Sequence, residues 1–181
     1  MTSKSGNKSN GTRSTGDTGK ARLAAGEPAT SLDVLQKVRI VIRAAQRHSL
    51  WVEKQCGVNG AQLWIMQELA EAPGLRVGQV TALLAIQQAT TSNLLEGLVR
   101  KGLVVKTRDP ADQRVVKLFL SAQGLALLEA APKPARGLLP EALASLAPAH
   151  LARLNAGLQG LLSSIEVIDE GFGLEPLPFT M

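Results

Sequence analysis

The stretch VTALLAIQQATTSNLLEGLVRKGLV, from Val80 to Val104, carries the clearest structural pattern of the sequence. Its apolar residues recur at the spacing of one helix face, which predicts a short helix over 77–85 and a second over 88–101. Gly102 is well placed to end the second helix. Two short helices joined by a tight turn are typical of a helix–turn–helix. The residues expected to face inward are Val80, Leu83, Leu84, Thr91, Leu94, Leu95 and Leu98.

The period of the pattern changes directly after this stretch. In residues 103–120, LVVKTRDPADQRVVKLFL, the pattern changes to a period of two: 103–107 reads as one strand and 115–120 as a second, on either side of a polar turn over 108–113. This pattern predicts a β-hairpin with a charged tip. The expected fold is therefore mainly α with a small β-hairpin wing, the order of elements found in a winged helix–turn–helix.

Helix signals flank this unit on both sides. Thr30 with Asp33, and Asn59 with Gln62, are spaced as capping boxes, so we expect helices over about 30–54 and 61–71. Ser121 caps the helix after the hairpin, prolines interrupt the following segment, and Pro148 starts a last helix that runs to about residue 165. The expected organisation is a basic, disordered tail over 1–30, one domain over 31–165 and a tail over 166–181.

Composition limits the function. The chain has 181 residues and a net charge of +5; residues 76–117 carry seven Lys/Arg against three Asp/Glu, and residues 118–181 carry three against six. A basic middle of this kind fits a nucleic-acid partner. One cysteine and two histidines make a disulfide or a His/Cys zinc site unexpected, and no apolar stretch is long enough to span a membrane. No residue set suggests catalysis, so neither an enzyme, a metal nor a cofactor is expected.

The second helix of the motif offers a polar face opposite its apolar one. Small amide and hydroxyl side chains on such a face can meet base edges in the major groove of DNA. The hairpin brings arginines beside it, within reach of the phosphate backbone or the minor groove. The residues expected to contact double-stranded DNA are Gln88, Ala89, Ser92 and Asn93 on the helix and Arg108 and Arg114 on the wing.

Over about residues 32–165 the sequence resembles the MarR family of bacterial transcriptional regulators. The resemblance is carried by Leu98, Gly102 and Leu103, by Asp112-Gln-Arg114 in the wing, and by the close of the hairpin at Leu118, Leu120, Ser121 and Gly124. Two departures stand out, because Gln87 replaces a common capping serine and Gly97 lies inside a helix. The resemblance implies a cytoplasmic, ligand-responsive repressor that binds a pseudo-palindromic operator as a homodimer.

The resemblance also assigns roles to residues. Arg114 would enter or flank the minor groove, and Asp112 would hold the wing tip by pairing with a nearby arginine. The dimer would be built from the first and last helices, 31–56 and within 121–165, around the winged unit at about 61–120. The apolar residues that would meet across it are Leu35, Val38, Ile42, Leu151, Leu154, Leu158 and Leu161.

Family members often bind a small molecule between the dimerisation helices and the DNA-binding lobe. A small aromatic or phenolic effector would here contact apolar side chains and a polar group that orients it, and an aromatic carboxylate could pair with Arg43 and Arg47. The residues expected to form this pocket are Arg43, Arg47, His48, Trp51, Trp64 and Met66. Two alternatives stay open: a winged-helix scaffold that binds protein, and a regulator that senses oxidants through Cys56.

Overall fold

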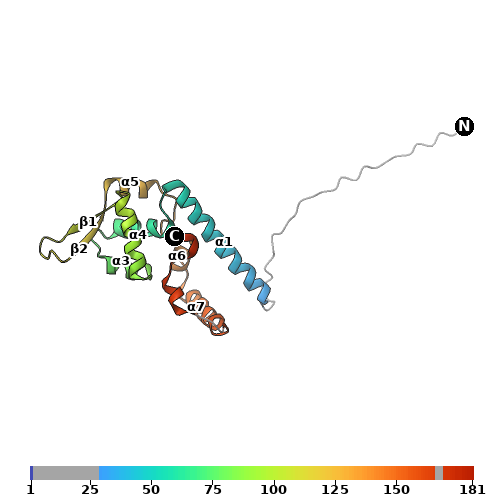
Figure 1. Cartoon of the computed structure of the whole chain (residues 1–181). Coiled ribbons are helices and arrows are strands. Elements are labelled where there is room, and N and C mark those ends of the chain that lie inside the picture. The colour runs from blue at the N-terminus through green and yellow to red at the C-terminus, as the bar shows by residue number, and fades with distance from the viewer. Residues whose placement is uncertain (2–28, 166–168) are drawn as a thin grey trace.

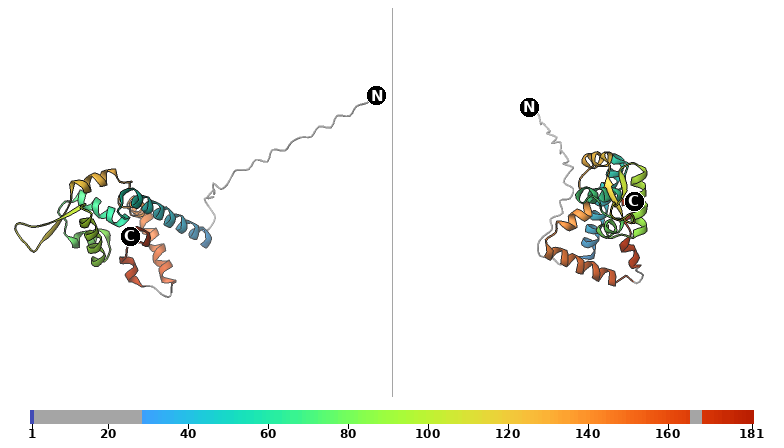
Figure 2. Two further views of the ribbon diagram at one scale, coloured as in Figure 1. Left: turned by 45° about the horizontal axis from the view of Figure 1, so that its top comes forward. Right: turned by 90° about the vertical axis from the view of Figure 1, so that its left-hand side faces the viewer.

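The computed structural model describes Met1, residues 29–165 and residues 169–181. The basic tail predicted over 1–30 therefore lies almost wholly outside the described residues. A helical lobe with a projecting hairpin forms one end of the molecule, and a long helix together with the last helices forms the other (Figure 1). The left view of Figure 2 shows the same division, and the right view looks at the molecule from the side of the hairpin.

Helix α1 (Ser31–Cys56) begins and ends at the predicted signals. The Thr30 side chain accepts from the Asp33 backbone N–H and the Asp33 carboxylate accepts from the Thr30 N–H, which completes the capping box. Gly57 ends the helix with φ of 63°, a left-handed conformation that favours glycine. The buried residues of α1 all lie between Ala45 and Val52, so its N-terminal half is left exposed.

Helices α2 (Gly60–Glu71), α3 (Val77–Leu84) and α4 (Gln88–Arg100) enclose the core. Its fully buried side chains include Leu63 and Met66 of α2 and Leu95 of α4. The prediction that Leu83 faces inward is wrong, since its side chain is 48% exposed. Helix α3 has only eight residues and buries Val80 and Leu84. Residue 83 lies about 100° around the helix from residue 84 and misses that contact line.

Strands β1 (Val104–Arg108) and β2 (Val116–Leu120) form the antiparallel wing. Val104 lies opposite Leu120 and Arg108 lies opposite Val116. Leu75 adds a bridge to Leu118, whose side chain is fully buried, and this bridge ties the base of the wing to the loop between α2 and α3. The predicted fold class, mainly α with a β-hairpin wing, is confirmed.

Helices α5 (Ala122–Ala130), α6 (Leu138–Ala144) and α7 (Pro148–Ser163) follow the wing. Ser121 caps α5 as predicted, by accepting from the Gly124 N–H. No side chain of α7, all of which is described, is buried within this chain. Residues 169–181, predicted as a tail, contain two short 3-10 helices, η1 (Glu170–Leu174) and η2 (Pro178–Thr180). Among the described residues, no helix is long and apolar enough to cross a membrane.

Candidate nucleic-acid interface and the adjoining pocket

Helix α4 presents the predicted polar face to solvent. Gln88, Ala89 and Asn93 are exposed and Ser92 is half-buried. The opposite face is buried in the core, where Thr91 also donates from its hydroxyl to the Gln87 carbonyl oxygen at 3.2 Å. The apolar face thus fixes the rotation of the helix and leaves the polar face free. DNA contact by these four residues stays a prediction.

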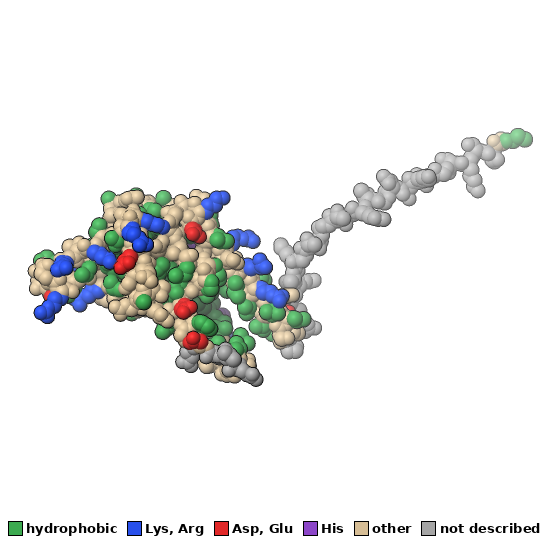
Figure 3. All heavy atoms as spheres, viewed as in Figure 1, with side chains coloured by type: hydrophobic (Ala, Val, Ile, Leu, Met, Phe, Trp, Pro, Cys, Tyr) green, Lys and Arg blue, Asp and Glu red, His purple; other side chains and the backbone are tan. Residues whose placement is uncertain are grey.

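Both arginines that were predicted on the wing are exposed to solvent. Arg108 ends β1 and Arg114 lies in the turn before β2, and both side chains are exposed. Lys and Arg side chains gather over this hairpin, which projects from the lobe (Figure 3). An exposed cationic hairpin beside a polar helix face is suited to phosphate contact on one side and base contact on the other.

An ion pair that the sequence reasoning missed holds the base of the wing turn. Lys117 Nζ lies 2.6 Å from Asp109 Oδ2, and Asp109 Oδ1 accepts from the Ala111 backbone N–H at 2.9 Å. The hydrogen bond from Lys117, followed by that from Ala111, holds the pKa of Asp109 below its ordinary value. Asp109 therefore stays ionised and orders the turn that carries Arg114.

Asp112 acts differently from the prediction. Its Oδ1 accepts from the backbone N–H of Arg114 at 3.0 Å, and among the described residues its carboxylate forms no ion pair with an arginine side chain. Asp side chains readily bond their own backbone two residues on, which closes a turn. The predicted partnership between these two residues is thus made through the Arg114 main chain, and the guanidinium is left in solvent.

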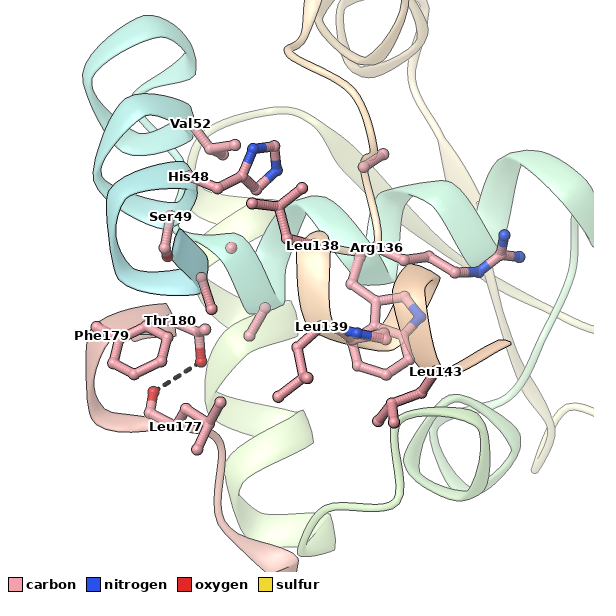
Figure 4. Close-up of a pocket in the computed structure, with 17 residues that line it drawn as sticks. His48, Ser49, Val52, Arg136, Leu138, Leu139, Leu143, Leu177, Phe179 and Thr180 are labelled. Atoms are coloured by element: carbon pink, nitrogen blue, oxygen red, sulfur yellow. Dashed lines mark hydrogen bonds between the residues drawn. The ribbon is translucent and has the colours of Figure 1, made fainter. Parts of the chain in front are cut away.

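A cavity of about 240 Å³ opens between the C-terminal half of α1, the start of α2, α6 and the last residues of the sequence. Its walls are mostly apolar, with Leu138, Leu139 and Leu143 from α6 facing Leu177 and Phe179 across it (Figure 4). A cavity lined in this way is typical of a site for a small apolar molecule.

The structure brings together only two of the six predicted pocket residues, His48 and Trp64. Arg43, Arg47 and Trp51 recur every four residues on the exposed side of α1, whereas the cavity touches the opposite side at Ala45, His48, Ser49 and Val52. Met66 is fully buried in the core instead. These four residues therefore do not line this cavity, and the pairing of a ligand carboxylate with Arg43 or Arg47 stays a prediction.

The cation that does reach the cavity wall, Arg136, is already paired. Its Nε donates to Glu68 Oε1 at 2.7 Å and its Nη2 donates to Glu71, so the guanidinium points away from the cavity (Figure 4). These bonds, that to Glu68 first, raise the pKa of Arg136. His48 is likewise engaged, since its Nε2–H donates to the Pro134 carbonyl oxygen at 3.0 Å. The charge of Arg136 is therefore already paired, and the Nε2 of His48 is already hydrogen-bonded.

The residues predicted for dimerisation form an exposed apolar surface. Leu35, Val38 and Ile42 on α1 are 39–48% exposed, and Leu151, Leu154, Leu158 and Leu161 on α7 are 40–50% exposed. Exposed hydrophobic side chains are visible along the N-terminal half of α1 in Figure 3. Clusters of exposed apolar side chains are typical of interaction surfaces, and dimerisation through α1 and α7 stays a prediction.

Cys56 lies at the end of α1, half-buried against the core. Burial raises the pKa of its thiol, which keeps it protonated and poorly nucleophilic. An oxidant sensor requires the opposite, a lowered pKa and free access.

Known proteins similar to this chain share its central unit. Residues 57–115 match the model of the MarR family. The chain is similar to the HTH-type transcriptional regulator YsmB of Bacillus subtilis (strain 168), with 23% identity over 54% of this chain and 66% of YsmB. It is also similar to the HTH-type transcriptional repressor MdtR of the same organism, with 29% identity over 40% of this chain and 46% of MdtR.

The chain matches only about half to two thirds of the length of these two relatives. Among solved structures, a MepR-like protein crystallised with pseudoligands has a TM-score of 0.52 and 20% identity, over 74% of this chain and 94% of that one. At this identity the likeness shows a shared fold.

Proposed function

From the MarR-family winged helix–turn–helix that residues 57–115 carry, we propose that the protein is a sequence-specific transcriptional regulator that binds double-stranded DNA. The observation that carries the proposal is the exposed polar face of α4 beside an exposed cationic wing. Gln88, Ser92 and Asn93 would read base edges in the major groove, and Arg108 and Arg114 would contact the backbone or the minor groove.

The active form would be a homodimer. The apolar surfaces of α1 and α7 are unpartnered in one chain, and a second copy brings an identical surface to them. A two-fold dimer places two recognition helices on successive major grooves of one duplex face, so the operator would be pseudo-palindromic with half-sites about 10 base pairs apart. Repression follows where such a site overlaps a promoter.

Fluorescence anisotropy of a labelled duplex at two salt concentrations tests DNA binding directly. We expect affinity that falls steeply as salt rises, because bound phosphates release counterions. Absence of binding at low salt would contradict the proposal and would favour the protein-binding scaffold instead.

The effector would be a small, neutral aromatic molecule such as a phenol. The cavity walls are apolar, Arg136 is paired with two carboxylates, and Ser49 supplies a hydroxyl at the wall. An anionic ligand would lose its hydration in this cavity without gaining a free cation. The ligand would regulate DNA binding by coupling the two sites.

Two fluorescent probes separate these ligand classes: neutral N-phenyl-1-naphthylamine and anionic 1-anilinonaphthalene-8-sulfonate. The neutral probe should bind more tightly, and Leu143→Asp should weaken its binding. Arg43→Ala and Arg47→Ala should leave the affinity unchanged, because both side chains lie outside the cavity. Tighter binding of the anionic probe, lost in either arginine variant, would contradict this assignment.

A further inference from the structure

Residues 169–181, here called the strap, fold back onto the domain. The second 3-10 helix of the strap, η2, packs against α1, and Leu177, Phe179 and Thr180 form one wall of the cavity. Figure 4 shows these three side chains on the side opposite α6. The strap is therefore part of the cavity and is positioned by the same apolar surface that would hold a ligand.

The strap also reaches the recognition helix. The Leu174 carbonyl oxygen accepts from the backbone N–H of Gln87 at 2.9 Å. Gln87 is the N-cap of α4, and its own side chain makes no capping hydrogen bond. Glu175 and Pro176 line a second small cavity together with residues 84–86, which join α3 to α4. One continuous segment thus links the cavity to the start of the helix that would enter the major groove.

The charge of the strap is opposite to that of its neighbour. The strap sequence contains Asp169, Glu170 and Glu175 and neither Lys nor Arg, whereas residues 76–117 carry a net charge of +4. Negative charge next to a phosphate-binding face reduces its attraction for DNA, and the effect is strongest at low salt.

We propose that the strap is an autoinhibitory element whose docked form weakens DNA binding. Docked, it occupies the Gln87 N–H and brings Glu175 close to the turn that precedes α4. A molecule in the cavity touches Leu177 and Phe179 as well as α6, so it favours the docked strap and lowers DNA affinity. This inference rests on the proposed DNA-binding function.

A disulfide can lock the strap in place for a direct test. A Cβ added at Gly60 would lie 3.6 Å from the Thr180 Cβ, within the range of about 3.5–4.5 Å that disulfides require. The added Cβ would lie 2.9 Å from Ser49 Oγ, which can move away by rotation about χ1. Gly60→Cys/Thr180→Cys is made in full-length Cys56→Ser protein so that only the intended pair can form. Thr180→Cys alone, in the same background, is the control for reductant and oxidant.

We expect the oxidised, locked protein to bind a labelled duplex at least about five-fold more weakly than the same protein reduced, a difference of about 1 kcal/mol. The single-cysteine control should bind equally in both conditions. Circular dichroism of the two redox forms checks that the helices are retained. Equal affinity of the locked and reduced forms, or tighter binding by the locked form, would overturn the proposal.

A charge variant tests the same proposal without a disulfide. Asp169→Asn/Glu175→Gln should bind DNA about two- to five-fold more tightly at low salt, and Asn keeps the oxygen that caps Gly171. Glu53→Gln/Glu129→Gln changes the net charge equally but lies outside the strap, and it should have the smaller effect. Equal effects of the two pairs would overturn the local electrostatic contribution. Binding by every form without these differences refutes the strap alone, whereas no binding by any form refutes the DNA-binding function and the strap with it.

Discussion

The side-chain amide of Gln62 lies directly over Gly97. Gln62 Nε2 donates to the Leu94 carbonyl oxygen at 3.3 Å, and a Cβ added at Gly97 would lie 2.7 Å from the same nitrogen. Both residues are buried. The glycine, which costs helix propensity, therefore lets α2 approach α4 closely and fixes the position of α4 on α2.

Gly97→Ala should destabilise the fold by about 1–2 kcal/mol, because overpacking costs more than the helix propensity gained. Urea denaturation measures this change. Gly78→Ala is the matched control, since its added Cβ meets no atom within 4 Å, and it should be neutral or slightly stabilising. The double variant Gln62→Ala/Gly97→Ala should recover part of the loss. Stabilisation by Gly97→Ala alone would contradict the packing account.

Arg114→Ala should weaken operator binding by about 1–3 kcal/mol if the side chain reads a base, or should lower the salt slope by about one if it touches only phosphate. The Asp109–Lys117 pair and the Asp112 cap hold the turn without using the Arg114 guanidinium. Anisotropy titrations over a salt series distinguish the two roles. Lys54→Ala, an exposed cation on the last turn of α1, is the control. Wild-type affinity and slope in Arg114→Ala would remove this residue from the interface.

Leu158→Glu should convert a dimer into a monomer, because it places a charge in the centre of the apolar surface of α7. Light scattering after gel filtration should give a mass near 19.1 kDa for the variant and about twice that for the wild type. Leu125→Glu on α5 is matched in exposure, at 45% against 47%, but lies outside this surface and should leave the mass unchanged. A monomeric wild type would refute the proposed assembly.

The thiol of Cys56 should react slowly with alkylating agents and oxidants. Since burial raises its pKa, the thiolate is scarce at neutral pH and alkylation by iodoacetamide should be slower than that of free cysteine. Hydrogen peroxide should leave DNA affinity unchanged in the wild type and in Cys56→Ser. Loss of affinity on oxidation in the wild type, absent from Cys56→Ser, would support the redox-sensing alternative.

Local sequence signals predicted the elements well. The Thr30 and Asn59 capping boxes and the Ser121 cap each start a helix in the structure, because they are satisfied within a few residues. The alternation over 103–120 likewise predicts the hairpin, whose register is fixed by burial of Leu118. These features depend on neighbours in sequence and can be read without the fold.

The pocket depended on contacts that no local pattern reveals. Arg136 lies in a proline-rich segment, and it meets Glu68 and Glu71 only after α5 has returned the chain to α2. The helical phase of α1 could have excluded Arg43 and Arg47, since they lie opposite the apolar Ala45 and Val52. The docking of the strap could not be predicted, because its bond to Gln87 is a main-chain contact and carries no side-chain signature.

Selection of bound duplexes from a random DNA pool at two salt concentrations reports both the sequence specificity of the protein and the symmetry of its site. We expect enrichment of an inverted repeat with half-sites about 10 base pairs apart, and persistence of the same motif at the higher salt. Binding without an enriched motif, or no binding even at low salt, would contradict a sequence-specific dimeric regulator.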